Sequence, residues 1–114
     1  MKDNLEVIVT GTQETANYPK GANYYPVNFM NEQSTNKFID YLKTQNVDIL
    51  INNAGINKID KFENISINDF DSILRINLRA PFQLCQAVIP NMKKKNWGRI
   101  VNLTSIFGTV TKEY

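Results

Sequence analysis

The chain has 114 residues, of which 42% are hydrophobic and 21% are charged, and its formal net charge is +2. This length allows one small domain, and so small a charge does not indicate a nucleic-acid partner. One Cys and no His exclude an internal disulfide, a Cys-rich or His-based metal site and a His-dependent catalytic triad. No apolar run approaches the roughly 20 residues that span a bilayer. The first residues do not resemble a secretory signal, so we expect a cytoplasmic protein without a membrane partner.

The first third of the chain predicts two short strands and a helix. Residues 5–10 are rich in β-branched side chains and predict a strand. A loop without a clear period leads to a second predicted strand, residues 24–29, in which Pro26 favours an edge position. A helix is then expected from a cap near Ser34 to Leu42.

The remaining elements alternate between strand and helix. Residues 47–51 form a run typical of a strand that is buried on both faces. A long helical pattern follows over residues 66–90, with Ser66 and Asn68 as candidate N-caps. Pro81 within it should kink the helix or split it in two. Residues 99–104 predict the last strand. Alternating strands and helices favour right-handed crossovers, and therefore an α/β fold with a parallel sheet.

Polar residues follow two of these strands, at positions where α/β proteins usually place their chemistry. Asn52 and Asn53 end the strand at 47–51, and Ser105 follows the last strand. Asn77 lies among apolar residues of the long helix, so it either anchors a structural hydrogen bond or holds a water. A serine at a strand end is more often a helix cap or turn former than a catalytic group. Taken singly, none of these residues establishes a site.

Three motifs taken together resemble one family. They are residues 48–55 (DILINNAG), residues 75–78 (RINL) with 81–82 (PF), and residues 98–105 (GRIVNLTS) followed by Gly108. Because the three motifs occur in this order, the chain resembles the short-chain dehydrogenase/reductase family of NAD(P)-dependent oxidoreductases over nearly its whole length. Its style is closest to the 3-oxoacyl-thioester reductases. The resemblance implies one partial Rossmann-like domain over residues 1–114: a parallel sheet with flanking helices, an incomplete three-layer α/β/α arrangement.

The resemblance also implies roles for individual residues. Asn53, Ala54 and Gly55 match the turn that lines the ribose and nicotinamide side of the cofactor. Ser105 matches the serine that hydrogen-bonds the carbonyl or hydroxyl of the substrate and polarises it as the hydride moves. Asn77 matches the helix asparagine that holds a water in the proton relay. The implied reaction is hydride transfer between the cofactor and a small-molecule carbonyl or secondary alcohol.

Two further positions bear on the cofactor. Asn28 occupies the place where the family usually has an acidic residue beside the adenine, and its amide can still form a hydrogen bond. Residues 7–12 match the family's second strand. In members that use NAD, an acidic residue at the tip of this strand hydrogen-bonds the ribose 2′-hydroxyl of the cofactor. Here the tip is neutral, and the Thr12 hydroxyl could face a 2′-phosphate. We therefore expect NADP rather than NAD.

Two family features have no counterpart in the sequence. No G-x-x-x-G-x-G phosphate turn occurs, and residues 2–5 are expected to be only the tail of a preceding helix. No Tyr-x-x-x-Lys pair occurs either, because Tyr114 follows Ser105 too closely to match the family's general acid. We interpret the chain as a central fragment that is inactive alone. Without the family's first strand, we expect a marginal or partner-dependent fold unless residues 7–10 move into the central place.

An alternative interpretation is a non-catalytic module that uses the fold for association. The helix at 66–90 matches the one through which the family commonly forms dimers and tetramers, and the parent enzyme is expected to be a homo-oligomer. Phe70, Leu74, Leu78 and Phe82 recur along this helix and could contact a partner. We expect most of them to cover the sheet instead.

Overall fold

The computed structural model describes residues 4–105. In chain order, the elements are β1 (Ile8–Gly11), β2 (Asn23–Pro26), α1 (Glu32–Thr44), β3 (Ile49–Asn52), the 3₁₀ turn η1 (Phe62–Asn64), α2 (Ile67–Leu74), the π-helix η2 (Arg75–Arg79), α3 (Ala80–Lys95) and β4 (Arg99–Asn102). All four predicted strands and both predicted helical segments are present, with shifted ends. The helix tail expected at residues 2–5 is absent at Asn4 and Leu5, which are irregular. Residues 2–3, Gly108 and Tyr114 lie outside the described residues.

Both long helical segments begin at side-chain caps. Ser66 caps α2 as predicted, since its hydroxyl accepts the N–H of Asp69 at 3.0 Å. The cap of α1 is Asn31 rather than Ser34: the Asn31 side chain accepts the N–H of Ser34 at 2.8 Å. The predicted start was therefore wrong by three residues, because a serine in the first turn was taken for the cap itself.

The long helical pattern splits as Pro81 predicts. Proline has no N–H, so Pro81 cannot donate to the carbonyl of Asn77, four residues earlier. The backbone responds with a π-helical turn, in which the N–H of Ala80 donates to the carbonyl of Arg75. Helix α3 then continues from Ala80 as a regular α-helix.

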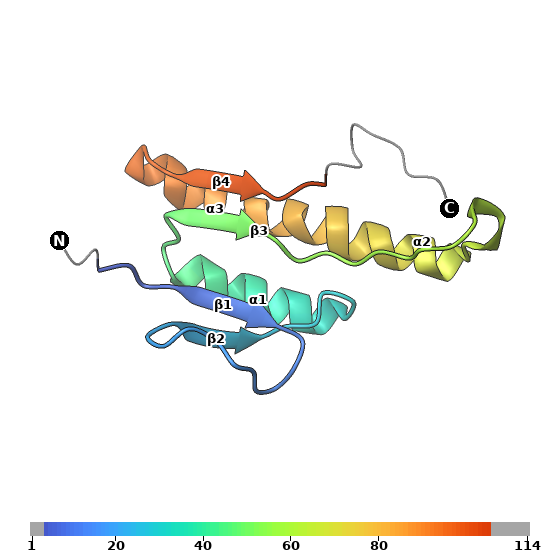
Figure 1. Cartoon of the computed structure of the whole chain (residues 1–114). Coiled ribbons are helices and arrows are strands. Elements are labelled where there is room, and N and C mark those ends of the chain that lie inside the picture. Colours follow the sequence, from blue (N-terminus) through green and yellow to red (C-terminus); the bar gives the residue numbers. More distant parts are fainter. Residues whose placement is uncertain (1–3, 106–114) are drawn as a thin grey trace.

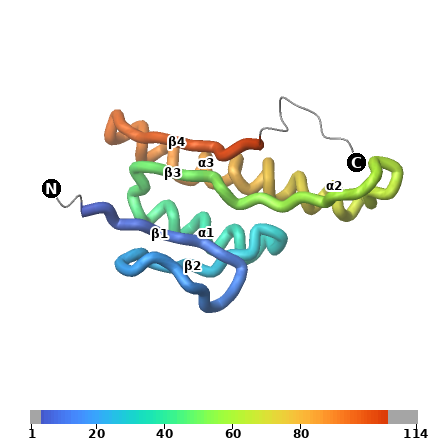
Figure 2. Tube along the Cα trace, in the orientation of Figure 1, coloured from blue at the N-terminus to red at the C-terminus, as the bar shows by residue number. Residues whose placement is uncertain are grey.

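The strands form two parallel pairs. β1 pairs with β2 in the register Ile8↔Asn23, and β3 pairs with β4 in the register Ile49↔Arg99. Within the described residues, β1 and β3 do not pair, so the two sheets stay separate. All four arrows point the same way, and β1 and β3 are the inner strands (Figure 1; Figure 2). The expected α/β fold is confirmed, and β2 is an edge strand, but residues 7–10 have not moved to join the sheets.

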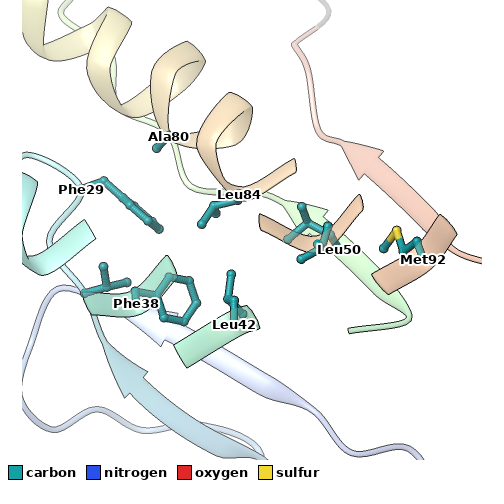
Figure 3. Packing of buried hydrophobic residues seen from close by; sticks show 9 residues of the cluster. Phe29, Phe38, Leu42, Leu50, Ala80, Leu84 and Met92 are labelled. Carbon is teal, nitrogen blue, oxygen red and sulfur yellow. The ribbon is translucent and has the colours of Figure 1, made fainter. Parts of the chain in front are cut away.

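One layer of helices covers the sheets. α1 packs against α3, and both helices lie behind the strands in Figure 1. Figure 3 shows Phe38 and Leu42 of α1, Leu84 of α3 and Leu50 of β3 converging on the core between them. On the other face Ile51 is 59% exposed, so no second helical layer covers it in the described part of the chain. The three-layer arrangement is incomplete, as predicted.

The apolar positions on α2, η2 and the start of α3 do not cover the sheet. Phe70, Leu74, Leu78 and Phe82 are 51%, 40%, 65% and 62% exposed. The expectation that most of them pack on the sheet was therefore wrong. The buried face of α3 begins with Ala80 and Leu84, whereas α2 and η2 contain no buried residue. Between residues 4 and 105, no helix is long and apolar enough to cross a membrane.

Candidate functional site

The predicted site residues follow the carboxyl ends of the strands. Thr12 comes directly after β1, Asn28 two residues after β2, Asn53 directly after β3, and Ser105 three residues after β4. The strand ends point toward the same side of the molecule in Figure 1. Residues that are far apart in the sequence therefore share one edge, which is where α/β proteins bind ligands. All four are exposed.

The register of β3 and β4 brings the turn after β3 to the level of the serine. Asn52 is opposite Asn102, and the N–H of Leu103 donates to the carbonyl of Asn52 at 3.0 Å, which extends the pairing past the strand ends. Gly55 and Ser105 each lie three residues beyond these paired positions. The turn at residues 53–55 and Ser105 thus follow two neighbouring paired strands at the same edge of the sheet.

Asn77 anchors the turn after β3. Its Oδ1 accepts the N–H of Ile56 at 2.9 Å, and its Nδ2 donates to the Ile56 carbonyl at 2.8 Å. A Cβ at Gly55 would lie 3.5 Å from the same Oδ1, so the turn passes close to the π-helix. Of the two roles weighed for this amide, the structure shows the anchor. The side chain is exposed, so the apolar burial expected from its neighbours was wrong.

The sequence did not predict the π-helical turn that carries Asn77. Such turns are rare and are frequently found at functional sites. The one available signal was Pro81, which removes the donor for the Asn77 carbonyl. A proline predicts a disturbed helix, but it does not say whether the backbone will kink, break or widen.

Asn28 shapes the turn between β2 and α1. Its N–H donates to the Ser34 hydroxyl at 2.9 Å, and its Oδ1 accepts the N–H of Met30 at 3.0 Å. Within residues 4–105, no hydrogen bond of its Nδ2 is observed, and the residue is exposed. The same side chain can therefore hold the turn and donate one hydrogen bond outward.

The loop after β1 folds back over β2. The Tyr24 hydroxyl donates to the carbonyl of Gln13 at 2.6 Å, and the Tyr18 and Tyr24 rings stack with centroids 5.4 Å apart. A Cβ at Gly11 would lie 2.7 Å from the Tyr24 hydroxyl, so the close approach needs glycine. In the described part of the chain, the residues after β1 form no helix whose N-terminus could hold a pyrophosphate.

Asn52 belongs to the core rather than to the site. It is only 9% exposed, and its Nδ2 donates to Asn102 Oδ1 at 2.8 Å and lies 3.7 Å from Cys85 Sγ. Side chains alternate between the two faces along β3, so Asn52 lies on the face that is covered by the helices. Asn53 follows at the exposed edge. The first asparagine of the pair thus ties the two strands together, and only the second can meet a ligand.

The described part of the chain has two surface hollows of note. One, of about 700 Å³, is formed by the end of α3 and the start of β4 around Trp97, and the other, of about 580 Å³, lies along α2 and η2 around Arg75. Neither includes a predicted site residue.

Comparisons with known proteins agree with these features. The model of the family described as short chain dehydrogenase matches residues 1–113. A 3-oxoacyl-[acyl-carrier-protein] reductase from Aquifex aeolicus is 37% identical over 114 residues, which cover 90% of this chain and 46% of that protein. A D-beta-hydroxybutyrate dehydrogenase from Rhizobium meliloti is 42% identical over 67 residues, covering 59% of this chain and 26% of the relative. The chain thus spans less than half the length of these relatives.

Solved structures share the fold. A short-chain dehydrogenase from Streptomyces avermitilis superposes with a TM-score of 0.80 at 23% identity, covering 93% of this chain and 42% of the other. A structure from Beutenbergia cavernae that contains NADP at low occupancy superposes with a TM-score of 0.72 at 25% identity, covering 79% of this chain and 36% of the other. The arrangement of strands and helices seen here therefore also occurs inside complete dehydrogenases.

Proposed function

This chain belongs to the short-chain dehydrogenase family, and we propose that it supplies the nicotinamide side of an NADP-dependent oxidoreductase site. The observation that carries the proposal is the shared edge, where the turn at residues 53–55 and Ser105 follow neighbouring strands in register. When bound, NADP(H) supplies or accepts the hydride. The chain's residues would position the nicotinamide and polarise the substrate.

Each residue has a distinct part in the proposed site. Ser105 donates a hydrogen bond to the substrate oxygen, where negative charge develops during hydride transfer to a carbonyl. Asn53, Ala54 and Gly55 form a flat wall of small residues, and Asn77 holds this wall in place through Ile56. Because the Asn77 side chain is engaged there, its backbone carbonyl is the atom we assign to the water of the proton relay. Pro81 cannot donate to that carbonyl.

The preference for NADP rests on the neutral turn after β1. A carboxylate at this position would repel the 2′-phosphate, whereas the Thr12 hydroxyl can donate to it. We place Asn28 beside the adenine, where its Nδ2 can donate a hydrogen bond. The proposed enzyme acts in the cytoplasm.

The substrate class follows from the names of the relatives. They include a 3-oxoacyl-[acyl-carrier-protein] reductase, a D-beta-hydroxybutyrate dehydrogenase and an acetoacetyl-CoA reductase. The compounds in these names share a carbonyl or hydroxyl group at the third carbon of an acyl chain. We propose a 3-oxoacyl thioester as the substrate of the complete site.

We further propose that the 114-residue chain is inactive alone. It contains neither a glycine-rich phosphate turn nor a Tyr-x-x-x-Lys pair, so it can neither hold the pyrophosphate nor supply the general acid. Incubating the chain with NADPH and acetoacetyl-CoA should give no oxidation of NADPH. Oxidation that is lost on Ser105→Ala would overturn this proposal.

A chimera tests the role of the site residues in an active setting. Residues 4–105 replace the matching segment of the Aquifex reductase, and NADPH consumption with acetoacetyl-CoA is measured. We expect activity in the chimera and a loss of about 100-fold in kcat on Ser105→Ala, the usual scale for a lost transition-state hydrogen bond. Ser72→Ala on α2, away from the edge, should leave kcat unchanged. Equal activities of the two variants would refute the assignment of Ser105.

A second candidate function is association between copies of this chain. The side chains of Phe70, Leu74, Leu78 and Phe82 are exposed, and Leu74 and Leu78 line the same surface hollow. Exposed apolar side chains that lie close together typically mark an interface, and we propose that a second copy covers this surface.

Light scattering of the full chain tests this association. A dimer that forms without NADP and becomes a monomer on Leu78→Lys would support it. Ile59→Lys, at a loop position that is 63% exposed, should leave the dimer intact. A monomeric chain, or a dimer that tolerates Leu78→Lys, would show that this face is not the interface.

A further inference from the structure

The loop after β1 is attached to the rest of the chain through one side chain. Residues 12–18 leave the carboxyl end of β1 and lead back toward the start of β2 (Figure 2). The Tyr24 hydroxyl donates to the Gln13 carbonyl at 2.6 Å, and the Tyr24 ring stacks on Tyr18 with an interplanar angle of 10°. Among residues 4–105, no other hydrogen bond, ion pair or ring contact of residues 12–18 is observed. The observed polar and ring contacts of this loop thus all end on Tyr24.

Tyr24 lies on the face of β2 that the helices leave uncovered. The next residue, Tyr25, stacks on Tyr41 of α1 with ring centroids 4.6 Å apart. Because side chains alternate along a strand, Tyr24 points to the opposite face. Its ring lies across Gly11, where a Cβ would lie 2.7 Å from the hydroxyl and 3.2 Å from Cε2. Glycine at the end of β1 therefore makes room for the hydroxyl to reach the Gln13 carbonyl.

The Gln13 carbonyl lies between two side chains with opposite preferences for the ribose of a cofactor. Thr12 precedes it, and its hydroxyl can donate to a 2′-phosphate. Glu14 follows it, and its carboxylate can accept from a 2′-hydroxyl but repels a phosphate. Both side chains are exposed, and among the described residues Glu14 forms no ion pair. Which of the two meets the ribose therefore depends on how the turn is held at Gln13.

We propose that Tyr24 is a positioning residue that sets the preference for a 2′-phosphate, because it holds the turn so that Thr12 rather than Glu14 meets the ribose. This inference rests on the proposed use of NADP, and it adds a residue that lies outside the turn, on the neighbouring strand. The hydroxyl acts through the Gln13 carbonyl and does not itself touch the cofactor. Without the hydroxyl, the turn loses its one observed hydrogen bond, and Glu14 can approach the place of the phosphate.

Binding of nucleotide fragments to the ¹⁵N-labelled full chain tests the proposal. Adenosine 2′-monophosphate carries the 2′-phosphate, adenosine 5′-monophosphate lacks it, and amide shifts give both dissociation constants. The unaltered chain should prefer the 2′-monophosphate. Tyr24→Phe keeps the ring and its stack on Tyr18 and removes only the hydroxyl. It should weaken binding of the 2′-monophosphate about tenfold, the upper scale of one lost hydrogen bond, and leave binding of the 5′-monophosphate unchanged.

Three further variants make the result specific. Tyr25→Phe makes the same change on the opposite face, where no hydrogen bond of that hydroxyl is observed in the described residues, and should leave both affinities unchanged. Gly11→Ala adds a Cβ that displaces the Tyr24 hydroxyl and should weaken binding of the 2′-monophosphate as Tyr24→Phe does. Glu14→Gln, added to Tyr24→Phe, removes the repelling charge and should restore most of the affinity. A general loss of stability would not be rescued by that change.

The chimera with the Aquifex reductase gives a second measurement. Tyr24→Phe in the chimera should raise the KM for NADPH about tenfold and leave kcat unchanged, because the nicotinamide end of the site is not altered. Tyr25→Phe should change neither constant. A fall in kcat with an unchanged KM would contradict a role at the ribose.

The fragment measurements can also overturn the proposal. Equal binding of the 2′-monophosphate by Tyr24→Phe and Tyr25→Phe would show that the hydroxyl does not set the preference. Equal losses for the two nucleotides would show that Tyr24 has a structural role only. No rescue by Glu14→Gln would exclude competition between the two side chains. An unaltered chain without any preference for the 2′-monophosphate would refute the proposed use of NADP, and the inference with it.

Discussion

The anchor between Asn77 and Ile56 can be tested by removing the amide. Asn77→Ala deletes two hydrogen bonds, of 2.9 and 2.8 Å, that hold the turn after β3 on the π-helix. A hydrogen bond contributes about 0.5–1.5 kcal/mol net, and this pair is exposed. We therefore expect the free energy of unfolding to fall by about 1–2 kcal/mol, taking the lower part of that range for each bond.

The control must separate the lost contact from the change in residue type. Alanine favours a helix over asparagine by up to about 0.7 kcal/mol, which would mask part of the effect. Asn36→Ala makes the same change in α1, at an exposed position with no side-chain hydrogen bond in the described structure. The difference between the two variants isolates the contribution of the anchor.

Urea unfolding and amide exchange give two independent measurements. Asn77→Ala should lower the urea midpoint relative to Asn36→Ala without a change in slope. The Ile56 amide should exchange about tenfold faster in Asn77→Ala only, because it loses its acceptor. Equal unfolding midpoints, together with an unchanged Ile56 amide, would refute the anchoring role. In that case the turn would be held by other contacts.

Two further predictions concern packing and ionisation. Val88→Ala changes a side chain that is 1% exposed and should lower the free energy of unfolding by about 2 kcal/mol. Ile67→Ala changes a side chain that is 74% exposed and should lower it by less than about 0.5 kcal/mol. Equal losses of the two variants in urea unfolding would contradict the burial of Val88. The Asn64 amide and the Lys61 N–H donate to the Asp60 carboxylate and hold its pKa below the ordinary 3.8. Because donors stabilise the charged form, Asn64→Ala should raise that pKa in an NMR titration, and an unchanged pKa would contradict the contact.

The order of the elements could be predicted from the sequence because their signals are local. β-branched runs marked the strands, and Ser66 marked the start of α2. Errors arose where two local signals competed. Asn31 and Ser34 are both good caps, and only the observed hydrogen bond identifies Asn31 as the cap. Likewise, Pro81 predicted a disturbed helix, and only the observed bond from the Ala80 N–H to the Arg75 carbonyl identifies the disturbance as a π-helical turn.

The candidate site residues could be named from the sequence, but their burial and hydrogen bonds could not. Asn52 and Asn53 are adjacent and chemically identical, yet alternation along β3 buries the first and exposes the second. Asn77 was identified, but its partner Ile56 lies 21 residues away, beyond the reach of any local pattern. The roles of Thr12, Asn28, Asn53, Ala54, Gly55 and Ser105 toward a cofactor and substrate stay predictions.

The sequence by itself determined the α/β class, the parallel direction of the strands and the family, because these depend on residue patterns and on motifs in a fixed order. Only the tertiary structure decided which backbone edges are paired and which apolar faces are covered. Pairing and coverage depend on contacts between distant segments. The sequence pattern therefore predicted that Ile51 is buried, whereas it is 59% exposed in the structure. In the described residues, β1 and β3 lie on the same layer of packed helices but do not pair with each other.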